Sequence, residues 1–91
     1  MRKTIWKFNL MITGQQDVLV PEGAVPLSVQ EQHGLLCIWF LVDLDSSPVP
    51  ITLLIVGTGQ PLNQTDAKQV EYLGTVQMTS GFVWHVFVRR T

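Results

Sequence analysis

The chain has 91 residues, of which 46% are hydrophobic and only 14% are charged, and its net charge at pH 7 is −1. This length fits one domain over residues 1–91, and the near-neutral charge excludes a global attraction to nucleic acid polymers or to a membrane surface. No apolar run approaches the ~20 residues of a membrane-spanning helix, so we expect a soluble, intracellular protein.

The first third of the chain is divided into short strands by turn residues. Residues 3–12 alternate between apolar and polar side chains, as a strand with one buried face does. A turn at 13–16 leads into a short strand over 17–20, and the Pro-Glu-Gly triplet at 21–23 predicts the next turn.

Residues 25–32 form the next predicted strand. Pro26 removes one backbone donor, so this strand is expected at a sheet edge or with a bulge near its start. A two-residue hairpin loop at His33 and Gly34 follows, with glycine in the second position. The apolar face of the strand is formed by Val25, Leu27 and Val29.

Three segments, 35–42, 51–56 and 82–88, are apolar without alternation. A strand that is apolar on both faces is expected to be buried from both sides. No long helical pattern supplies the second covering, and the charged fraction is well below the ~25% of typical soluble domains. These features together predict that another copy of the chain covers part of the surface, as a homodimer or higher homo-oligomer.

The rest of the chain contains one long irregular stretch over 57–66, a strand over 71–78 and a turn at 79–81. With the elements above, this makes about seven short, mostly antiparallel strands with frequent turns. The predicted fold class is therefore all-β, as a small sandwich or barrel.

Basic residues gather at the two ends of the chain, whereas the acidic residues lie between them. If the first and last strands lie side by side, the ends form one cationic patch for an anionic ligand. The bases concerned are Arg2, Lys3, Lys7, Arg89 and Arg90.

The stretch beginning at Gly57 has two interpretations. Its glycines favour a turn with positive φ, and they would also let backbone N–H groups approach a ligand. It lacks the Gly-Lys-Ser/Thr ending of a phosphate loop. A tryptophan beside a basic patch would add stacking to charge. The candidate ligand-binding residues are Arg2, Lys3, Thr58, Gly59, Gln60, Trp84, Arg89 and Arg90.

No pattern in the sequence indicates catalysis, a metal or a cofactor. Cys37 is the one cysteine and lies in an apolar segment, so it is expected to be a buried structural thiol. His33 and His85 have no ligand partners at metal-binding spacing. We therefore expect a protein that is not an enzyme, with no catalytic residues, no metal and no cofactor.

Several segments together resemble a family of small proteins that bacteriophages and prophages encode and that is described as a domain of unknown function. The segments are Lys3-Thr4-Ile5-Trp6-Lys7-Phe8, Gly57-Thr58-Gly59-Gln60-Pro61-Leu62, Tyr72-Leu73-Gly74-Thr75-Val76-Gln77 and Val83-Trp84-His85-Val86-Phe87. The family commonly has histidine at the position of Gln60, so a role of that histidine does not transfer to this chain. The resemblance implies a phage genome as the source and the cytoplasm of a bacterial host as the location.

Three functions remain open at this point. The first is a binding protein that sequesters a small anionic, nucleotide-like immune signal and so counters bacterial anti-phage defence. The second is a docking module that inhibits a host or defence protein through an exposed strand edge or apolar patch. The third is a minor structural or assembly component of the phage.

Overall fold

The computed structural model describes residues 2–62 and 69–89. The sequence predicts about seven strands, and the described residues contain seven. Their bounds are β1 Lys3–Leu10, β2 Gln15–Pro21, β3 Val25–Gln32, β4 Leu35–Asp43, β5 Pro48–Gly57, β6 Val70–Gln77 and β7 Val83–Arg89.

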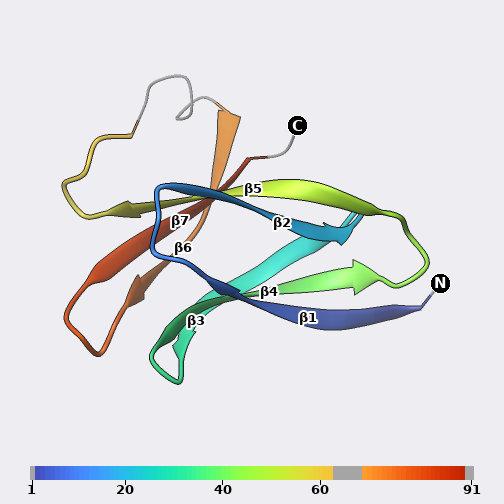
Figure 1. Ribbon diagram of the computed structural model, residues 1–91, viewed down its shortest axis with the longest axis horizontal. Helices are drawn as coiled ribbons and strands as arrows, with labels where there is room; N and C mark the ends of the chain where they lie inside the picture. The colour runs from blue at the N-terminus through green and yellow to red at the C-terminus, as the bar shows by residue number, and fades with distance from the viewer. Residues whose placement is uncertain (1, 63–68, 90–91) are drawn as a thin grey trace.

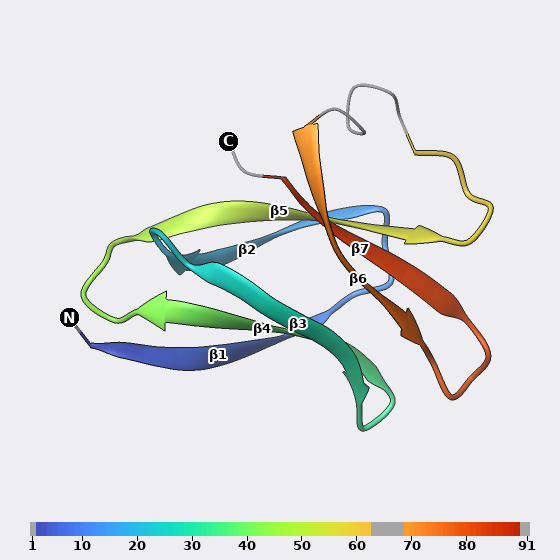
Figure 2. The same cartoon turned by 180° about the vertical axis from the view of Figure 1, so that it is seen from behind.

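The strands form two antiparallel sheets that pack as a small sandwich (Figures 1 and 2). The order is β1-β4-β3 in the first sheet, called sheet A, and β2-β5-β7-β6 in the second, called sheet B. The sheets do not close into a barrel, so the all-β prediction is confirmed in its sandwich form.

Alternate side chains of each strand point between the two sheets and form one apolar core. The largest fully buried side chains include Phe40, Leu36, Ile38 and Leu53. The buried core members are Leu10, Val20, Ala24, Val29, Leu36, Ile38, Phe40, Val42, Ile51, Leu53, Ile55, Val76, Val86 and Val88.

The three unbroken apolar segments are interior strands, namely β4 in sheet A and β5 and β7 in sheet B. An interior strand has neighbours on both sides, which also cover its outward side chains. Cys37 and Leu54 point away from the core, yet their exposed fractions are 0% and 5%. Neighbouring strands of the same chain thus supply part of the second covering that the sequence predicts for these apolar segments. Self-association stays a prediction.

The β3–β4 connection is the two-residue hairpin that the sequence predicts. His33 has φ 53° and Gly34 has φ 79°, so both loop residues are left-handed. This is the arrangement of a type I′ turn, whose twist matches that of the flanking strands.

Pro26 has both predicted consequences, since β3 is an edge strand and its register shifts between Pro26 and Ser28. The bulge also changes which face each side chain occupies. Val25 lies opposite Leu41 and is 47% exposed, whereas Val29 lies opposite Ile38 in the core. The prediction of one apolar face for this strand is therefore wrong, because a bulge adds a residue and reverses the alternation.

Candidate functional site

Among residues 2–62 and 69–89, the basic side chains of the two chain ends do not form one cationic patch. β1 is an edge strand of sheet A, whereas β7 lies inside sheet B between β5 and β6, and both views show β1 beginning away from the end of β7 (Figures 1 and 2). Arg2 and Lys3 are thus separated from Arg89. The predicted adjacency of the end strands is wrong, because strand order depends on long-range pairing that local pattern does not encode. Arg90 lies outside the described residues.

Arg2 already has an acidic partner. Its guanidinium donates to Asp45 from both Nε, at 3.1 Å, and an Nη atom, at 2.8 Å. Both side chains are more than half exposed, so the pair is a surface ion pair of small energetic value.

The residues from Gly57 to Gln60 form a tight turn. The Gln60 N–H donates to the Gly57 carbonyl at 3.0 Å, and Gly59 has φ 87°, as the third position of a type II turn requires. The Gln60 side chain folds back, and its Oε1 accepts the Gly57 N–H at 2.7 Å. The residues thus form a turn, but positive φ occurs at Gly59 alone, whereas the sequence led us to expect it at both glycines. The turn also holds Thr58 and Gln60 in position.

A hollow of about 430 Å³ adjoins this turn, and we call it the Phe82–Trp84 hollow. It lies where the end of β5 and the connection between β6 and β7 meet. Three of the candidate residues, Thr58, Gln60 and Trp84, line it together, and Gly59 belongs to the same turn. The full lining is Gly57, Thr58, Gln60, Gly81, Phe82, Val83 and Trp84.

Two aromatic rings form one wall of the hollow. The ring centroids of Phe82 and Trp84 are 5.8 Å apart and their planes are inclined by 22°, which is a stacked arrangement. Trp84 packs against the core, whereas Phe82 is 63% exposed. The sequence gives no sign that Phe82 differs from the other core-like aromatics, because exposure at a turn depends on the tertiary structure.

A chain of hydrogen bonds starts at Thr58 and continues over the outer face of sheet B. Thr58 Oγ1 lies 2.7 Å from His85 Nε2, Thr75 Oγ1 lies 2.9 Å from His85 Nδ1, and Tyr72 OH lies 2.5 Å from Thr75 Oγ1. Both ring nitrogens of His85 therefore bond to hydroxyl groups, one on each side of the ring. The effect of this chain is to fix the Thr58 hydroxyl at the rim of the hollow.

Sequence reasoning missed this role of His85. The sequence shows only that His85 has no partners at metal-binding spacing, and its actual partners are the hydroxyl groups of Thr58 and Thr75. Thr75 lies directly opposite His85 in the β6–β7 pairing, and β6 is bulged between Tyr72 and Gly74. The register could not be derived from the sequence, because one bulge changes every later cross-strand neighbour.

The connection that carries Phe82 is tied to sheet A. The Glu31 carboxylate accepts hydrogen bonds from the Thr79 N–H at 2.9 Å and from the Thr79 hydroxyl at 3.0 Å. Glu31 belongs to β3, so these bonds join the two sheets beside the hollow and restrain the connection before Phe82.

Two further hollows, of about 460 and 240 Å³, adjoin the same end of the sandwich. Gln60 lines all three, and Trp84 lines the smaller one as well. Exposed Met11 and Ile12 lie on the neighbouring β1–β2 connection. This end therefore combines concave space with apolar side chains.

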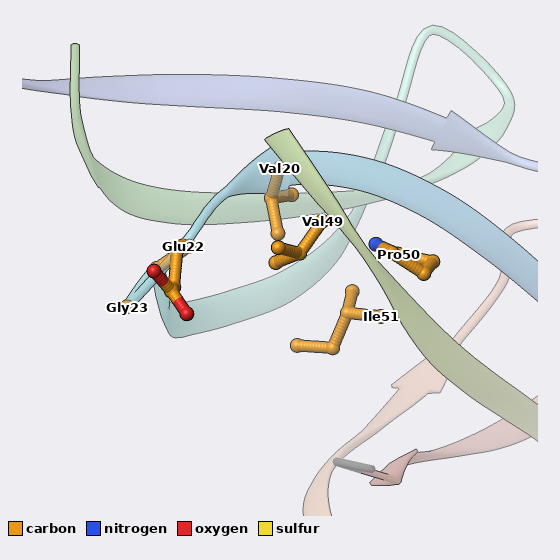
Figure 3. Close-up of a pocket in the computed structure, with 7 residues that line it drawn as sticks. Val20, Glu22, Gly23, Val49, Pro50 and Ile51 are labelled. Carbon is orange, nitrogen blue, oxygen red and sulfur yellow. The ribbon is translucent and has the colours of Figure 1, made fainter. Parts of the chain in front are cut away.

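A separate hollow of about 370 Å³ lies where β2 ends and β5 begins (Figure 3). Val20, Val49 and Ile51 form its apolar wall, and Glu22 places a carboxylate beside it (Figure 3). A carboxylate repels anions, so this hollow does not suit the anionic ligand that the sequence suggested. None of the candidate residues that the structure describes lines it.

Within residues 2–62 and 69–89, no group of three His, Cys, Asp or Glu side chains is placed to hold a metal ion. The same part of the chain has no helix that is long and apolar enough to cross a membrane.

No curated protein and no solved structure matches the chain. A family model does match it, under the description "Domain of unknown function (DUF7352)", and the match covers residues 1–91. The protein therefore belongs to the DUF7352 family.

Proposed function

We propose that this protein is a non-catalytic binding protein that holds a planar, nucleobase-like ring in the Phe82–Trp84 hollow. The observation that carries the proposal is the exposed Phe82 ring, which is stacked on the core-anchored Trp84 at the wall of a hollow. Aromatic side chains in such positions bind planar rings by stacking, at about 1–3 kcal/mol per base.

Polar groups at the same hollow suit the edge of a heteroaromatic ring. The Gln60 carbonyl is already used by the Gly57 N–H, which leaves the Gln60 amide NH₂ as a donor. The Thr58 hydroxyl is held by His85 and keeps further hydrogen-bonding capacity. A ring with acceptor atoms on its edge, such as a purine or a pyrimidine, fits these groups.

The structure gives less support to phosphate binding by the basic residues at the chain ends than to binding of a ring. Arg2 and Lys3 lie in the other sheet from the hollow, and Arg89 ends β7, several strand residues from Phe82. At about 3.3 Å per residue, Phe82 and Arg89 are roughly 23 Å apart along an extended strand, too far for one nucleotide. The proposed ligand is therefore recognised through its ring, and a phosphate adds little affinity.

The biological setting is part of the same proposal. The sequence resemblance suggests a phage protein in the cytoplasm of a bacterial host, where sequestering a nucleobase-containing signal would counter anti-phage defence. A docking module that inhibits a host protein is the second candidate. It is favoured by exposed Met11, Ile12 and Phe82, which lie on connections at the same end of the sandwich.

A thermal-shift panel of free nucleobases, nucleosides and nucleotides tests the ring proposal. We expect nucleosides and nucleotides of the preferred base to raise the melting temperature alike, and Phe82→Ala to abolish the shift. Leu19→Ala is the matched control, because Leu19 is also 63% exposed but lies on β2. A panel without any shift would refute the proposal, and a shift caused by phosphate-bearing compounds alone would refute recognition through the ring.

A further inference from the structure

The edges of a sheet are where strands of different chains can pair. An edge strand presents a row of unpaired backbone N–H and C=O groups, which natural proteins usually block with proline, bulges or charge. In the described residues the edge strands are β1 and β3 of sheet A and β2 and β6 of sheet B.

Three of these edges carry a feature that disfavours pairing. β3 has Pro26 and a bulge beside it, β6 is bulged between Tyr72 and Gly74, and β2 ends in Pro21. β1 has neither a bulge nor a proline, all eight of its residues pair one to one with β4, and its only protection is the charge of Lys3 and Lys7. It is the edge best suited to accept another strand.

The side chains of β1 are also poorly covered. Every residue from Lys3 to Lys7 is exposed, on both faces of the strand. Ile5 is 57% exposed on the outer face, and Trp6 is 38% exposed on the face that carries Phe40. A second strand paired with β1 would cover its open edge and the exposed apolar side chains of Ile5 and Trp6.

We propose that two copies of this chain pair through β1, antiparallel, about a two-fold axis at Trp6. The result is one continuous sheet with the order β3-β4-β1-β1-β4-β3. A two-fold axis makes each copy present the same strand to the other, so the interface closes and no fibre grows. This proposal is independent of the ring-binding hollow.

The free backbone groups of β1 can be identified from its register with β4. The Leu44 N–H donates to the Arg2 carbonyl at 2.8 Å, and these two residues extend the β1–β4 pairing by one position. Hydrogen-bonded positions alternate along an antiparallel pair. Even-numbered residues of β1 therefore bond β4, and the groups of Lys3, Ile5, Lys7 and Asn9 face the open edge.

The two lysines exclude two registers, and among the others the register centred on Trp6 pairs the most residues of β1. Pairing centred on Ile5 would place Lys3 opposite Lys7, and pairing centred on Lys7 would place that residue opposite its own copy. Like charges directly opposite each other destabilise a strand pair. Pairing centred on Trp6 instead places Ile5 opposite Lys7 and Lys3 opposite Asn9, with all their backbone groups bonded.

The same register accounts for the exposure of Trp6. At the two-fold axis, Trp6 meets Trp6 of the second copy as a non-hydrogen-bonded pair, in which Cα atoms are about 4.5 Å apart. The indole already packs edge-on against Phe8, with centroids 6.4 Å apart. The second indole would extend this aromatic row and cover the open side of Trp6.

Sedimentation velocity over a dilution series tests whether the chain dimerises. We expect a reversible monomer–dimer equilibrium. A monomer at every concentration would overturn the proposal. A dimer that persists unchanged in the charge variants described next would overturn the proposed interface.

Charge variants of Ile5 test the edge and its register. Ile5→Glu places a carboxylate opposite Lys7 and should tighten the dimer, whereas Ile5→Lys should weaken it, each by roughly 2- to 30-fold over the two symmetric pairs. The double variant Ile5→Lys with Lys7→Glu again places a lysine opposite a glutamate and should tighten the dimer as Ile5→Glu does. Val25→Glu and Val25→Lys are matched controls, since Val25 is exposed on the same face at the far edge of sheet A.

The outcome that contradicts the register is equally specific. In registers centred on Ile5 or on Lys7, Ile5→Glu would not face Lys7 and would fail to tighten the dimer. Circular dichroism melts of each variant show whether it is folded. A folded Ile5→Lys monomer supports the proposal. If Ile5→Lys is unfolded, Ile5→Glu serves as the test of the interface in its place.

Discussion

Phe82 and Trp84 stack with their ring centroids 5.8 Å apart, and only Trp84 is anchored in the core. The two residues therefore have different roles. Trp84 is part of the fold, and it also fixes where the exposed ring of Phe82 lies. A variant of Phe82 can thus separate binding from stability, which a variant of Trp84 cannot.

Phe82→Ala should lower the free energy of unfolding by only about 0.5–1.5 kcal/mol, the usual value of an aromatic pair. Ring binding should nevertheless be lost, since the stacking surface is gone. Urea unfolding and a nucleoside titration of the same sample measure the two quantities. Unchanged binding with reduced stability would show that the ring pair is only structural.

His85→Phe should weaken ring binding by roughly 2- to 13-fold, because Thr58 loses the imidazole that holds its hydroxyl. Thr75→Val is the matched comparison, since it breaks the chain on the other side of His85 and leaves the Thr58 bond intact. An equal loss of ligand affinity in both variants would contradict an effect of His85 that is transmitted through Thr58. Isothermal titration with the preferred nucleoside gives both values.

Glu31→Ala should cost about 0.5–1.5 kcal/mol of unfolding free energy by removing the bonds to Thr79. It should also weaken ring binding, since the connection before Phe82 is then less restrained. Glu22→Ala removes the same charge and serves as the control. If both variants lose the same stability and affinity, the removed negative charge explains the losses and the contact with Thr79 does not.

Gly74→Ala should destabilise the fold by about 1–3 kcal/mol through overpacking. A Cβ at Gly74 would lie 2.8 Å from Cγ2 of Val29, where β6 of sheet B meets β3 of sheet A. Gly14→Ala should change stability by less than about 0.5 kcal/mol, because nothing lies within 4 Å of a Cβ there. Urea unfolding checks both.

A double variant isolates the cause. Gly74→Ala combined with Val29→Ala should be less destabilising than the sum of the single changes, because the second change removes the clashing methyl group. Strict additivity would mean that the clash with Val29 is not the source of the loss.

His33→Asn should raise the free energy of unfolding by up to about 1 kcal/mol. His33 has φ 53°, a left-handed conformation that asparagine adopts more readily than histidine. Gly34→Ala should act in the opposite direction, since φ is 79° there. A lower urea midpoint for His33→Asn would contradict a type I′ turn at this connection.

The sequence-based prediction succeeded where the signal is local. Glycine at position 34 and the proline at 26 indicated the hairpin and the bulge, and unbroken apolar segments marked the interior strands β4, β5 and β7. The Thr58–Gln60 turn and Trp84 were named as candidates, and they line one hollow together.

The predictions that failed are those that depend on long-range pairing of strands. No local pattern shows that β1 and β7 lie in different sheets, so the predicted cationic patch had no basis in the fold. The bulge in β3 placed Val25 on the outer face, and the register of β6 placed Thr75 opposite His85. Each of these facts follows from which strand pairs with which, and at which residue.

The most direct test of the ring-binding proposal uses the three tryptophans, which lie at separate places. Trp6 is at the open edge, Trp39 is on β4, and Trp84 lines the hollow. Each indole N–H gives its own signal in a ¹⁵N-correlated NMR spectrum, and single Trp→Phe variants assign them.

We predict that adenosine, or another nucleoside chosen from the thermal-shift panel, moves the Trp84 signal in a saturable manner and leaves the Trp6 and Trp39 signals in place. A titration in which the Trp84 signal stays fixed, or in which the Trp6 or Trp39 signal moves instead, would contradict ring binding in the Phe82–Trp84 hollow.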